Sequence, residues 1–192
     1  AEQAQLELIY AHHGAYQNEA AIEAADRFIR LHPQHPSVDY AFYMKGVAAY
    51  DLNKNFLASL IPSDDSKRDV TGVREAFGEF SQLLNRYPNS RYAQDARARM
   101  VYIRNMLARH EIHVANYYFK RGAYMAALKR GQNVVENMQE TTAVADGLAV
   151  MAQDYTLLDM SSLASDVVRV LCLNYPQQPN LDGECKFEGG YD

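Results

Sequence analysis

Hydrophobic positions recur at intervals of three and four residues along most of the chain, and strand-like alternation is nearly absent. That interval places the apolar side chains on one face of a helix. The periodic runs are rich in Ala, Leu, Glu, Gln, Arg and Met, which are good helix formers, and none contains a proline. The pattern predicts an all-α chain of about eight helices, at about 2–13, 17–31, 37–53, 70–87, 91–121, 123–138, 142–157 and 161–174.

Short polar or glycine-containing breaks separate these runs. We expect Gly14, Gly122 and the turn at Asp159–Ser161 to join antiparallel helices, because these residue types favour chain reversal. The run 91–121 has neither glycine nor proline between Tyr92 and Arg121. It is therefore either one long helix or two helices that break near His110.

Two segments lack a helical period. Residues 53–72 are rich in Ser, Asp, Lys and Arg around Pro62, and their composition predicts a surface loop. Loops of this length are more often functional than idle. The tail 176–192 has no period of any kind, and we expect it to be poorly ordered.

Four segments share the spacing of a tetratricopeptide (TPR) second helix, in which a small residue is followed by another core residue after four positions and a proline eight beyond. Small residues let two short amphipathic helices approach, and neighbouring hairpins cover the remaining apolar surface. The spacing predicts a TPR-like solenoid of helix hairpins over residues 1–175. The segments are Ala21/Ala25/Pro33, Ala76/Phe80/Pro88, Ala164/Val168/Pro176 and Ala127/Gly131, which has Gln139 in place of the proline.

The first helix of a TPR is expected to carry an apolar residue, a small residue and then a tyrosine. Val114-Ala115 with Tyr118 and Met151-Ala152 with Tyr155 fit this order, and Leu6-Glu7 with Tyr10 fits it loosely. The spacing is irregular, because the 53–72 loop is inserted within one repeat and the 91–121 helix serves two neighbours. A regular array would show neither departure.

Composition and charge narrow the possible functions. The 192 residues are 48% hydrophobic and 22% charged, with a formal net charge of −5. This mild acidity argues against general nucleic-acid binding, which needs a basic face. No stretch approaches 18 apolar residues, and none is long enough to span a bilayer. The N-terminal residues are polar and already have a helical pattern, which is typical of neither a signal peptide nor a domain start. We therefore expect a trimmed chain, whose localisation cannot be predicted from this end.

Two cysteines, Cys172 and Cys185, lie 13 residues apart. This spacing is neither a zinc framework nor a CxxC redox motif. Cys172 is either a small apolar residue on a helix with Cys185 in a loose tail, or the two form a disulfide in an oxidising compartment.

The sequence predicts no catalytic machinery, no cofactor and no metal. His110 and His113 flank Glu111, but a catalytic zinc would need a third protein ligand and supporting hydrogen bonds. A glycine-rich phosphate loop and a G-x-S-x-G elbow are both missing from the sequence. A metal-dependent hydrolase built on His110, Glu111 and His113 is the enzyme alternative, and metal analysis would test it.

Four local runs, together with the irregular spacing, resemble one family. The chain is similar, from residue 1 to about 176, to the BamD family, which are TPR lipoproteins of the bacterial outer-membrane β-barrel assembly machinery, also called ComL in some lineages. The lipid-bearing cysteine and the first repeat of the family would precede Ala1. The four runs are 25–33 (ADRFIRLHP), 39–46 (DYAFYMKG), 86–92 (RYPNSRY) and 114–124 (VANYYFKRGAY).

The resemblance implies a periplasmic scaffold, tethered by a lipid to the inner leaflet of the outer membrane. Its C-terminal half, about 89–175, would dock a POTRA domain of BamA. Its N-terminal half, about 1–88, would offer a groove to an extended segment of the partner lipoprotein BamC or of an unfolded outer-membrane protein. The alternative is a periplasmic TPR adaptor for peptidoglycan or cell-wall enzymes, which a coiled-coil oligomerisation segment upstream would favour.

The same resemblance implies positions for partner binding. Arg121 and Arg130 would face the POTRA domain, and Arg27 and Arg30 would lie on the groove side. Arg68 and Asp69 match a short sequence motif in a loop of the family. Taken alone, the sequence favours a solvated face for Arg121 and Arg130 over capture of a partner carboxylate by their guanidinium groups, and the resemblance reverses this preference for Arg130.

Tyrosines are the other candidates for partner contact, since they give amphipathic contact area at low entropic cost. Tyr118 is the packing residue of its repeat, and Tyr117 is left open as a groove residue. Tyr40 or Tyr43 is the better candidate in the N-terminal half.

Overall fold

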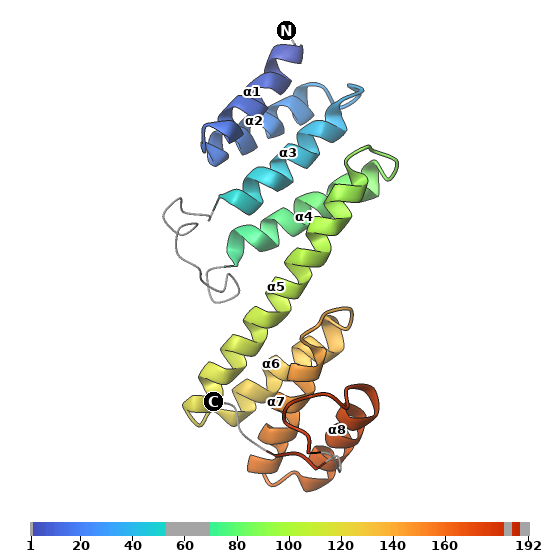
Figure 1. The fold of residues 1–192 in the computed structure, drawn as a ribbon. Coiled ribbons are helices and arrows are strands. Elements are labelled where there is room, and N and C mark those ends of the chain that lie inside the picture. Colours follow the sequence, from blue (N-terminus) through green and yellow to red (C-terminus); the bar gives the residue numbers. More distant parts are fainter. Residues whose placement is uncertain (1, 53–69, 183–185, 189–192) are drawn as a thin grey trace. The chain divides into compact units, whose positions relative to one another are not determined.

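The structure is a computed structural model that describes residues 2–52, 70–182 and 186–188 (Figure 1). The described residues are α-helical apart from turns and one isolated antiparallel bridge between Leu181 and Phe187, so the all-α prediction is confirmed. Most of the predicted 53–72 loop lies outside the described residues. The helices are α1 (Glu2–Gly14), α2 (Asn18–Leu31), α3 (Val38–Asp51), α4 (Thr71–Arg86), α5 (Ala93–Lys120), α6 (Tyr124–Asn137), α7 (Val144–Leu157) and α8 (Ser161–Asn174).

Two residues beyond the end of three helices stands a residue with a left-handed backbone. Tyr16, Gly122 and Asp159 have φ values of 60°, 73° and 59°, and they follow α1, α5 and α7. In each turn the next backbone N–H bonds five residues back, as from Ala123 to the Tyr118 carbonyl at 3.0 Å. This pattern satisfies the last carbonyls of a helix. Gly122 and the turn at 159 were predicted, but Gly14 is the last residue of α1 and the reversal occurs at Tyr16.

The repeat spacing predicted where the second helices end. Pro33, Pro88 and Pro176 each stand two residues beyond α2, α4 and α8. Proline there cannot continue a helix, because it lacks the backbone N–H and its ring clashes with the preceding turn. Gln139 stands at the same place after α6.

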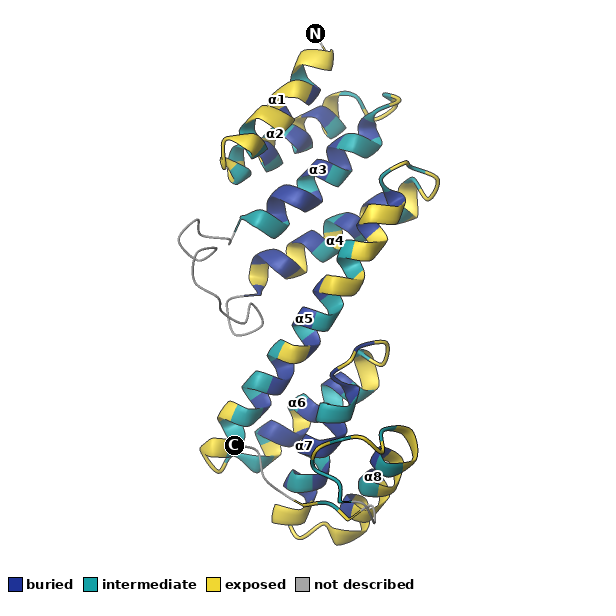
Figure 2. Cartoon of the chain, viewed as in Figure 1, coloured by how far each residue is buried: buried dark blue, intermediate teal, exposed yellow. Residues whose placement is uncertain are grey.

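The chain divides into two compact units, Ala1–Ile103 (unit 1) and Arg104–Asp192 (unit 2). In unit 1 the helices α1 to α4 pack against one another in chain order (Figure 1). Their buried faces point at one another and their outer faces are exposed (Figure 2). One core cluster of unit 1 is formed by Leu6, Ile9, Ala25, Phe28, Ala41 and Met44.

One cation ties three helices of unit 1 together. The ammonium of Lys45 on α3 lies 2.8 Å from an Asp26 oxygen on α2 and 3.0 Å from a Glu79 oxygen on α4. Burial alone would lower the pKa of Lys45, but the bonds to the two carboxylates outweigh it and raise that pKa. Lys45 therefore stays charged and links α2 and α4 across α3.

Unit 2 contains the second part of α5 and helices α6 to α8. The α5 helix is continuous from Ala93 to Lys120, so it does not break near His110. At the crossing of α6 and α7, Gly131 and Gly147 face each other, and a Cβ added at Gly131 would lie 2.9 Å from the Gly147 carbonyl oxygen. Only glycine allows this backbone approach.

The predicted small residues lie in the core. Ala21, Ala25, Ala76, Ala115, Ala127 and Ala152 are fully buried. The loose match at Leu6-Glu7 and Tyr10 is wrong at its last position, since Tyr10 is 65% exposed and Ile9 takes the buried place instead. The reason is the register of α1, which turns Leu6 and Ile9 inward and leaves Tyr10 outside.

The expectation of a poorly ordered tail is wrong for its described residues. Leu181 and Phe187, with Tyr175, pack against the core cluster of α6, α7 and α8. The Gln178 side chain donates to the Asp146 carboxylate of α7 at 3.0 Å. The tail has no helical period because these contacts are long-range and the backbone is not helical.

Candidate interaction surfaces

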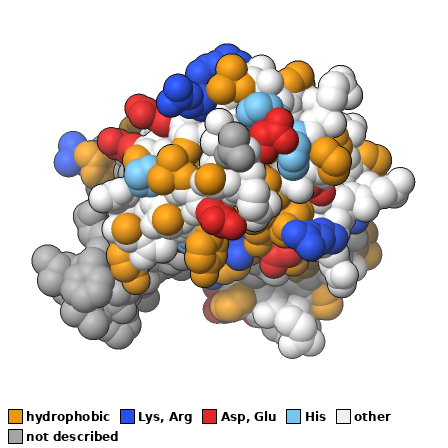
Figure 3. All heavy atoms as spheres, turned by 90° about the horizontal axis from the view of Figure 1, so that it is seen from above, with side chains coloured by type: hydrophobic (Ala, Val, Ile, Leu, Met, Phe, Trp, Pro, Cys, Tyr) orange, Lys and Arg blue, Asp and Glu red, His pale blue; other side chains and the backbone are white. Residues whose placement is uncertain are grey.

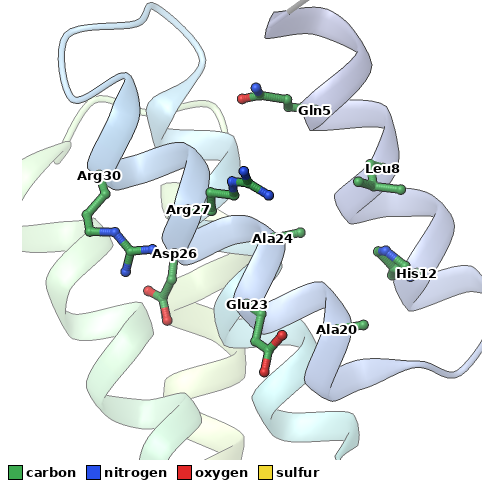
Figure 4. Close-up of a pocket in the computed structure, with 9 residues that line it drawn as sticks. All are labelled: Gln5, Leu8, His12, Ala20, Glu23, Ala24, Asp26, Arg27 and Arg30. Carbon is green, nitrogen blue, oxygen red and sulfur yellow. The ribbon is translucent and has the colours of Figure 1, made fainter.

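A hollow of about 740 Å³ lies between α1 and α2 in unit 1 (Figure 4). Residues spaced by three and four positions turn one face of each helix toward it, which is the spacing that brings side chains onto a common face. The two helices thus form the walls of one groove. From α1 it is lined by Gln5, Leu8 and His12, and from α2 by Ala20, Glu23, Ala24, Asp26, Arg27 and Arg30.

This groove contains both arginines that the sequence placed on the groove side. Arg27 and Arg30 stand on the α2 wall beside Glu23 and Asp26 (Figure 4). Gln5 on the opposite wall has a buried Oε1 that accepts no hydrogen bond within the described residues. A groove with charges of both signs and small residues can take the backbone and side chains of another chain.

Among the residues that the structure describes, the surface around this groove carries no block of one charge. Seen from the end of unit 1 that bears α1 and α2, hydrophobic, basic and acidic side chains are interspersed, and histidines lie beside an acidic side chain (Figure 3). His32 and His35 both approach the Glu2 carboxylate, at 3.2 and 3.6 Å. Mixed charge of this kind favours a specific partner over a polyanion.

An aromatic cluster forms a second surface of unit 1. Tyr40 lines a smaller hollow together with Tyr10, Arg91 and Tyr92. The Tyr43 and Tyr92 rings stack with centroids 4.7 Å apart, and Tyr40 lies 5.6 Å from the same Tyr92 ring. Tyr40 therefore faces the hollow, while Tyr43 supports the ring beside it.

Tyr43 is also held by a charged neighbour. Its hydroxyl donates to the Asp95 carboxylate at 2.7 Å, and Arg99 Nε donates to the same oxygen at 2.6 Å. Burial and the bond to Asp95 raise the pKa of Tyr43. Burial alone would raise the pKa of Asp95, but its two donors outweigh burial and lower it. These bonds fix the ring that Tyr92 stacks on.

In unit 2 the end of α5 presents an aromatic and basic patch. The Arg121 guanidinium lies 4.5 Å from the centroid of the Tyr117 ring, which is a cation–π contact. Tyr117 is 53% exposed, and Arg121 is exposed as well. Tyr118 packs against the core cluster of α5 to α7, as its repeat position predicted.

Arg130 on α6 interacts with Tyr118, whose ring centroid lies 5.8 Å from that of Tyr117, and it is already bound within the protein. Its Nη1 donates to Glu111 Oε2 at 2.9 Å, and the Glu111 side chain is only 4% exposed. The bond to Glu111 outweighs burial and raises the pKa of Arg130, with a further contribution from Tyr118. Arg130 thus neutralises a buried carboxylate, and the rest of its guanidinium reaches the surface.

Of the predicted binding residues, Arg68 and Asp69 lie outside the described residues. The structure brings Tyr117 and Arg121 together, with Arg130 nearby, and it brings Arg27 together with Arg30. The α1 wall of the groove was missed, although the spacing of Gln5, Leu8 and His12 would have predicted a shared face. The support that Tyr92 gives to Tyr40 and Tyr43 was missed because it is long-range.

The candidate metal site does not form. Glu111 is committed to Arg130, and the described residues contain no group of three or more His, Cys, Asp and Glu side chains that could hold a metal ion. The hydrolase alternative therefore has no support from this geometry.

Helix hairpins packed in sequence define a helical-repeat protein of the tetratricopeptide type, a class that acts by holding other proteins. A family model described as "YfiO: Outer membrane lipoprotein" matches residues 1–170. The chain belongs to this family, that of the BamD outer membrane protein assembly factors, whose members are scaffolds and not enzymes. The resemblance found in the sequence is thereby confirmed.

Relatives from several bacteria carry the same description, "Outer membrane protein assembly factor BamD". The protein of Neisseria meningitidis serogroup B is 44% identical over 181 residues, which cover 94% of this chain and 68% of the relative. That of Xylella fastidiosa strain 9a5c is 36% identical over 95% of this chain and 63% of its own length. That of Haemophilus influenzae is 35% identical over 90% of this chain and 66% of its own length.

Membership of the family also bears on localisation. The family consists of outer-membrane lipoproteins, which confirms the predicted placement at the outer membrane. Within the described ranges, no helix is both long and apolar enough to cross a membrane.

Proposed function

We propose that this chain assembles outer-membrane β-barrel proteins by holding a different partner on each half. The C-terminal half, about 89–175, docks a POTRA domain of BamA. The N-terminal half, about 1–88, holds an extended segment of a partner lipoprotein such as BamC or of an unfolded outer-membrane protein. The partners follow from the family, and the surfaces described above supply the chemistry.

The observation that carries the docking proposal is the patch of Tyr117, Arg121 and Arg130 in unit 2. Tyrosine and arginine are the residue types that dominate binding energy at protein interfaces. Arg121 is exposed and its guanidinium is held over the Tyr117 ring. A carboxylate of the partner can bind such a guanidinium through two parallel hydrogen bonds.

The docking test is titration calorimetry with the periplasmic region of the cognate BamA. Arg121→Glu is expected to weaken binding at least tenfold, because it places like charges across the interface. Arg169→Glu is the matched control, since it makes the same charge change in unit 2 on an exposed side chain of α8. Equal affinity of the Arg121→Glu variant and the parent would place the docking surface elsewhere.

Arg130 is part of the same proposal, but its reversal is a poorer test. Arg130→Glu is expected to weaken BamA binding, yet it would also set two carboxylates against each other, one of them the buried Glu111. Lost folding would then imitate lost docking. None of the bonds described above ties Arg121 to a buried carboxylate, so substitution of Arg121 separates lost docking from lost folding.

The α1–α2 groove supports the second half of the proposal. Arg27 and Arg30 offer guanidinium donors, and Glu23 and Asp26 offer acceptors. An extended segment presents unpaired backbone N–H and C=O groups that these side chains can satisfy.

The groove test is fluorescence anisotropy with labelled peptides from BamC and from an unfolded outer-membrane protein. Replacing Arg27 and Arg30 together by alanine is expected to weaken peptide binding at least fivefold, and Arg97→Ala on α5 is the control. Arg121→Glu should leave peptide binding unchanged if the two halves bind separately. A groove variant that binds like the parent would remove the groove from the proposal.

A further inference from the structure

Two pairs of tyrosines connect α3 with the first part of α5 in unit 1. The ring centroids of Tyr40 and Tyr92 are 5.6 Å apart, and those of Tyr50 and Tyr102 are 6.3 Å apart. Each tyrosine of the second pair follows one of the first pair by ten positions, which is about 15 Å along a helix. The same arrangement therefore occurs twice, at one spacing, on two segments that run in the same direction.

Each pair lines a hollow. Tyr40 and Tyr92 line one of about 240 Å³, and Tyr50 and Tyr102 line one of about 320 Å³. The two rings of a pair are inclined to each other, by 48° in the first and 78° in the second, so each pair forms a notch and not a flat platform. Grooves lined by aromatic side chains are the docking sites of proline-rich segments.

The two hollows also share a balance of charge among their described residues. One contains Arg91 and Glu7, and the other contains Arg99 and Asp95. Arg99 Nε lies 2.6 Å from the Asp95 carboxylate, so these two charges are already paired within the protein. A surface with one charge of each sign at each hollow complements an uncharged segment better than an acidic or a basic one.

The backbone of the two helices decides which conformation of a bound segment fits. A β-strand needs a neighbouring backbone to bond its N–H and C=O groups, whereas the backbone groups of α3 and α5 bond within each helix. A polyproline II segment keeps its backbone in water, and proline has no N–H to satisfy. Such a segment advances about 3.1 Å per residue, so about five residues span the distance between the hollows.

Hydrogen-bond donors stand beside the first notch. The Tyr92 hydroxyl accepts a bond from Arg91 Nη2 at 2.5 Å, which leaves its own hydrogen to donate to a peptide carbonyl. Burial, followed by the neighbouring Tyr92 and Tyr10, raises the pKa of Tyr40, so this hydroxyl also remains a donor at neutral pH. These groups suit a polyproline II segment, whose carbonyls form no internal hydrogen bonds.

We propose that the two hollows form one docking site for an uncharged, proline-rich segment of another protein in the polyproline II conformation. One proline occupies the notch of Tyr40 and Tyr92, and another, about five residues away, occupies the notch of Tyr50 and Tyr102. The site shares no described lining residue with the α1–α2 groove. It therefore does not depend on what that groove holds.

The test is fluorescence anisotropy of a labelled decaproline peptide titrated with the whole chain. Decaproline should bind saturably, whereas triproline, which is too short to reach both hollows, should bind at least tenfold more weakly. A Gly-Ser peptide of the same length, uncharged but flexible, should also bind at least tenfold more weakly. Equal binding of either comparison peptide would overturn the proposal. Binding of an N-acetylglucosamine oligomer without binding of decaproline would make the surface a glycan site and would also overturn it.

Two substitutions locate the bound peptide. Tyr10→Ala in the first hollow and Tyr102→Ala in the second should each weaken decaproline binding at least fivefold. Both side chains can be removed without unfolding the chain, because they are 65% and 47% exposed. Tyr16→Ala is the matched control, since this tyrosine is 81% exposed and lines neither hollow.

The variant with Arg27 and Arg30 replaced by alanine separates this site from the α1–α2 groove. It should bind decaproline like the parent, whatever its effect on the peptides tested for the groove. Loss of decaproline binding in that variant would overturn the proposal, as would parent-like binding by the Tyr10→Ala or the Tyr102→Ala variant.

Discussion

Asp154 on α7 gives the sharpest prediction about stability. Its side chain is fully buried, and neither carboxylate oxygen has a hydrogen-bond partner among the described residues. Burial without a partner disfavours the ionised form and raises the pKa of Asp154 from 3.8 to about 7. In the folded protein at neutral pH this carboxyl group is therefore close to half protonated.

The size and sign of the effect follow from that shift. The folded-state pKa is raised, so the folded protein holds a proton between about pH 4 and pH 7 that the unfolded chain releases. Stability from this group is highest below pH 4, falls as the pH rises through that window, and is lowest above pH 7. One pKa unit corresponds to about 1.4 kcal/mol, so the whole shift corresponds to about 4 kcal/mol.

The perturbation is Asp154→Asn, which keeps the shape and removes the ionisation. Between pH 5 and pH 8 the parent should lose about 2 to 3 kcal/mol of unfolding free energy relative to the variant. The measurement is urea unfolding followed by far-UV circular dichroism at several pH values. Parent and variant should share the same urea slope, so that the shift in midpoint reports stability.

The parent and the variant share every other titrating group, so the contributions of those groups cancel in the difference between the two unfolding free energies. Asp166→Asn on α8 is the control, because it makes the same substitution at an exposed carboxylate. Parallel profiles for the parent and Asp154→Asn from pH 5 to pH 8 would refute the reasoning. They would mean that Asp154 is solvated or paired when folded.

Two further predictions concern unit 2. Gly131→Ala should destabilise the fold by about 1 to 3 kcal/mol in thermal melts, because the new Cβ would meet the Gly147 carbonyl oxygen. Gly78→Ala on an open face of α4 is the control and should be neutral or slightly stabilising. Equal melting points of the two variants would contradict the close approach of α6 and α7. Arg130→Ala should lower the unfolding free energy measured in urea by about 1 to 3 kcal/mol, because it removes the bond that Arg130 donates to the buried Glu111 carboxylate. The double variant with Glu111→Gln should recover part of that loss.

The helices could be predicted from the sequence because their signals are local. Apolar residues at helical spacing place each helix within about three residues of its observed bounds. Pro33 and Pro88 mark the ends of α2 and α4 by removing a hydrogen bond that continuing the helix would need. Glycine was a less certain guide, since Gly14 remains helical and Tyr16 adopts the left-handed turn.

The tail could not be predicted, because its order depends on residues far away in the sequence. Leu181 and Phe187 are two isolated apolar residues in a polar stretch, and nothing near them indicates a core. The surface they cover is built by α6 to α8, and Gln178 binds a carboxylate 32 residues earlier. A period search finds helices and strands, and it cannot find a segment stabilised by contacts with an assembled unit.

The candidate surfaces show the same limit for charged residues. The sequence analysis assigned Arg121 and Arg130 the same role, contact with the POTRA domain, but only the structure shows that their environments differ. Arg121 rests on an exposed ring, whereas Arg130 reaches a carboxylate 19 residues earlier on another helix. No local pattern reports that pairing, because it depends on how α5 and α6 cross.

This difference sharpens the docking proposal. A guanidinium has five N–H donors in one plane, and the Arg130 bond to Glu111 uses Nη1. The remaining donors can meet a partner carboxylate without breaking the internal pair, and the pair already holds the side chain in place. A fixed side chain loses less conformational entropy when a partner binds. We therefore infer that Arg130 is the rigid element of the docking patch, while Arg121, whose guanidinium lies over the exposed Tyr117 ring, is the element that adjusts to the partner.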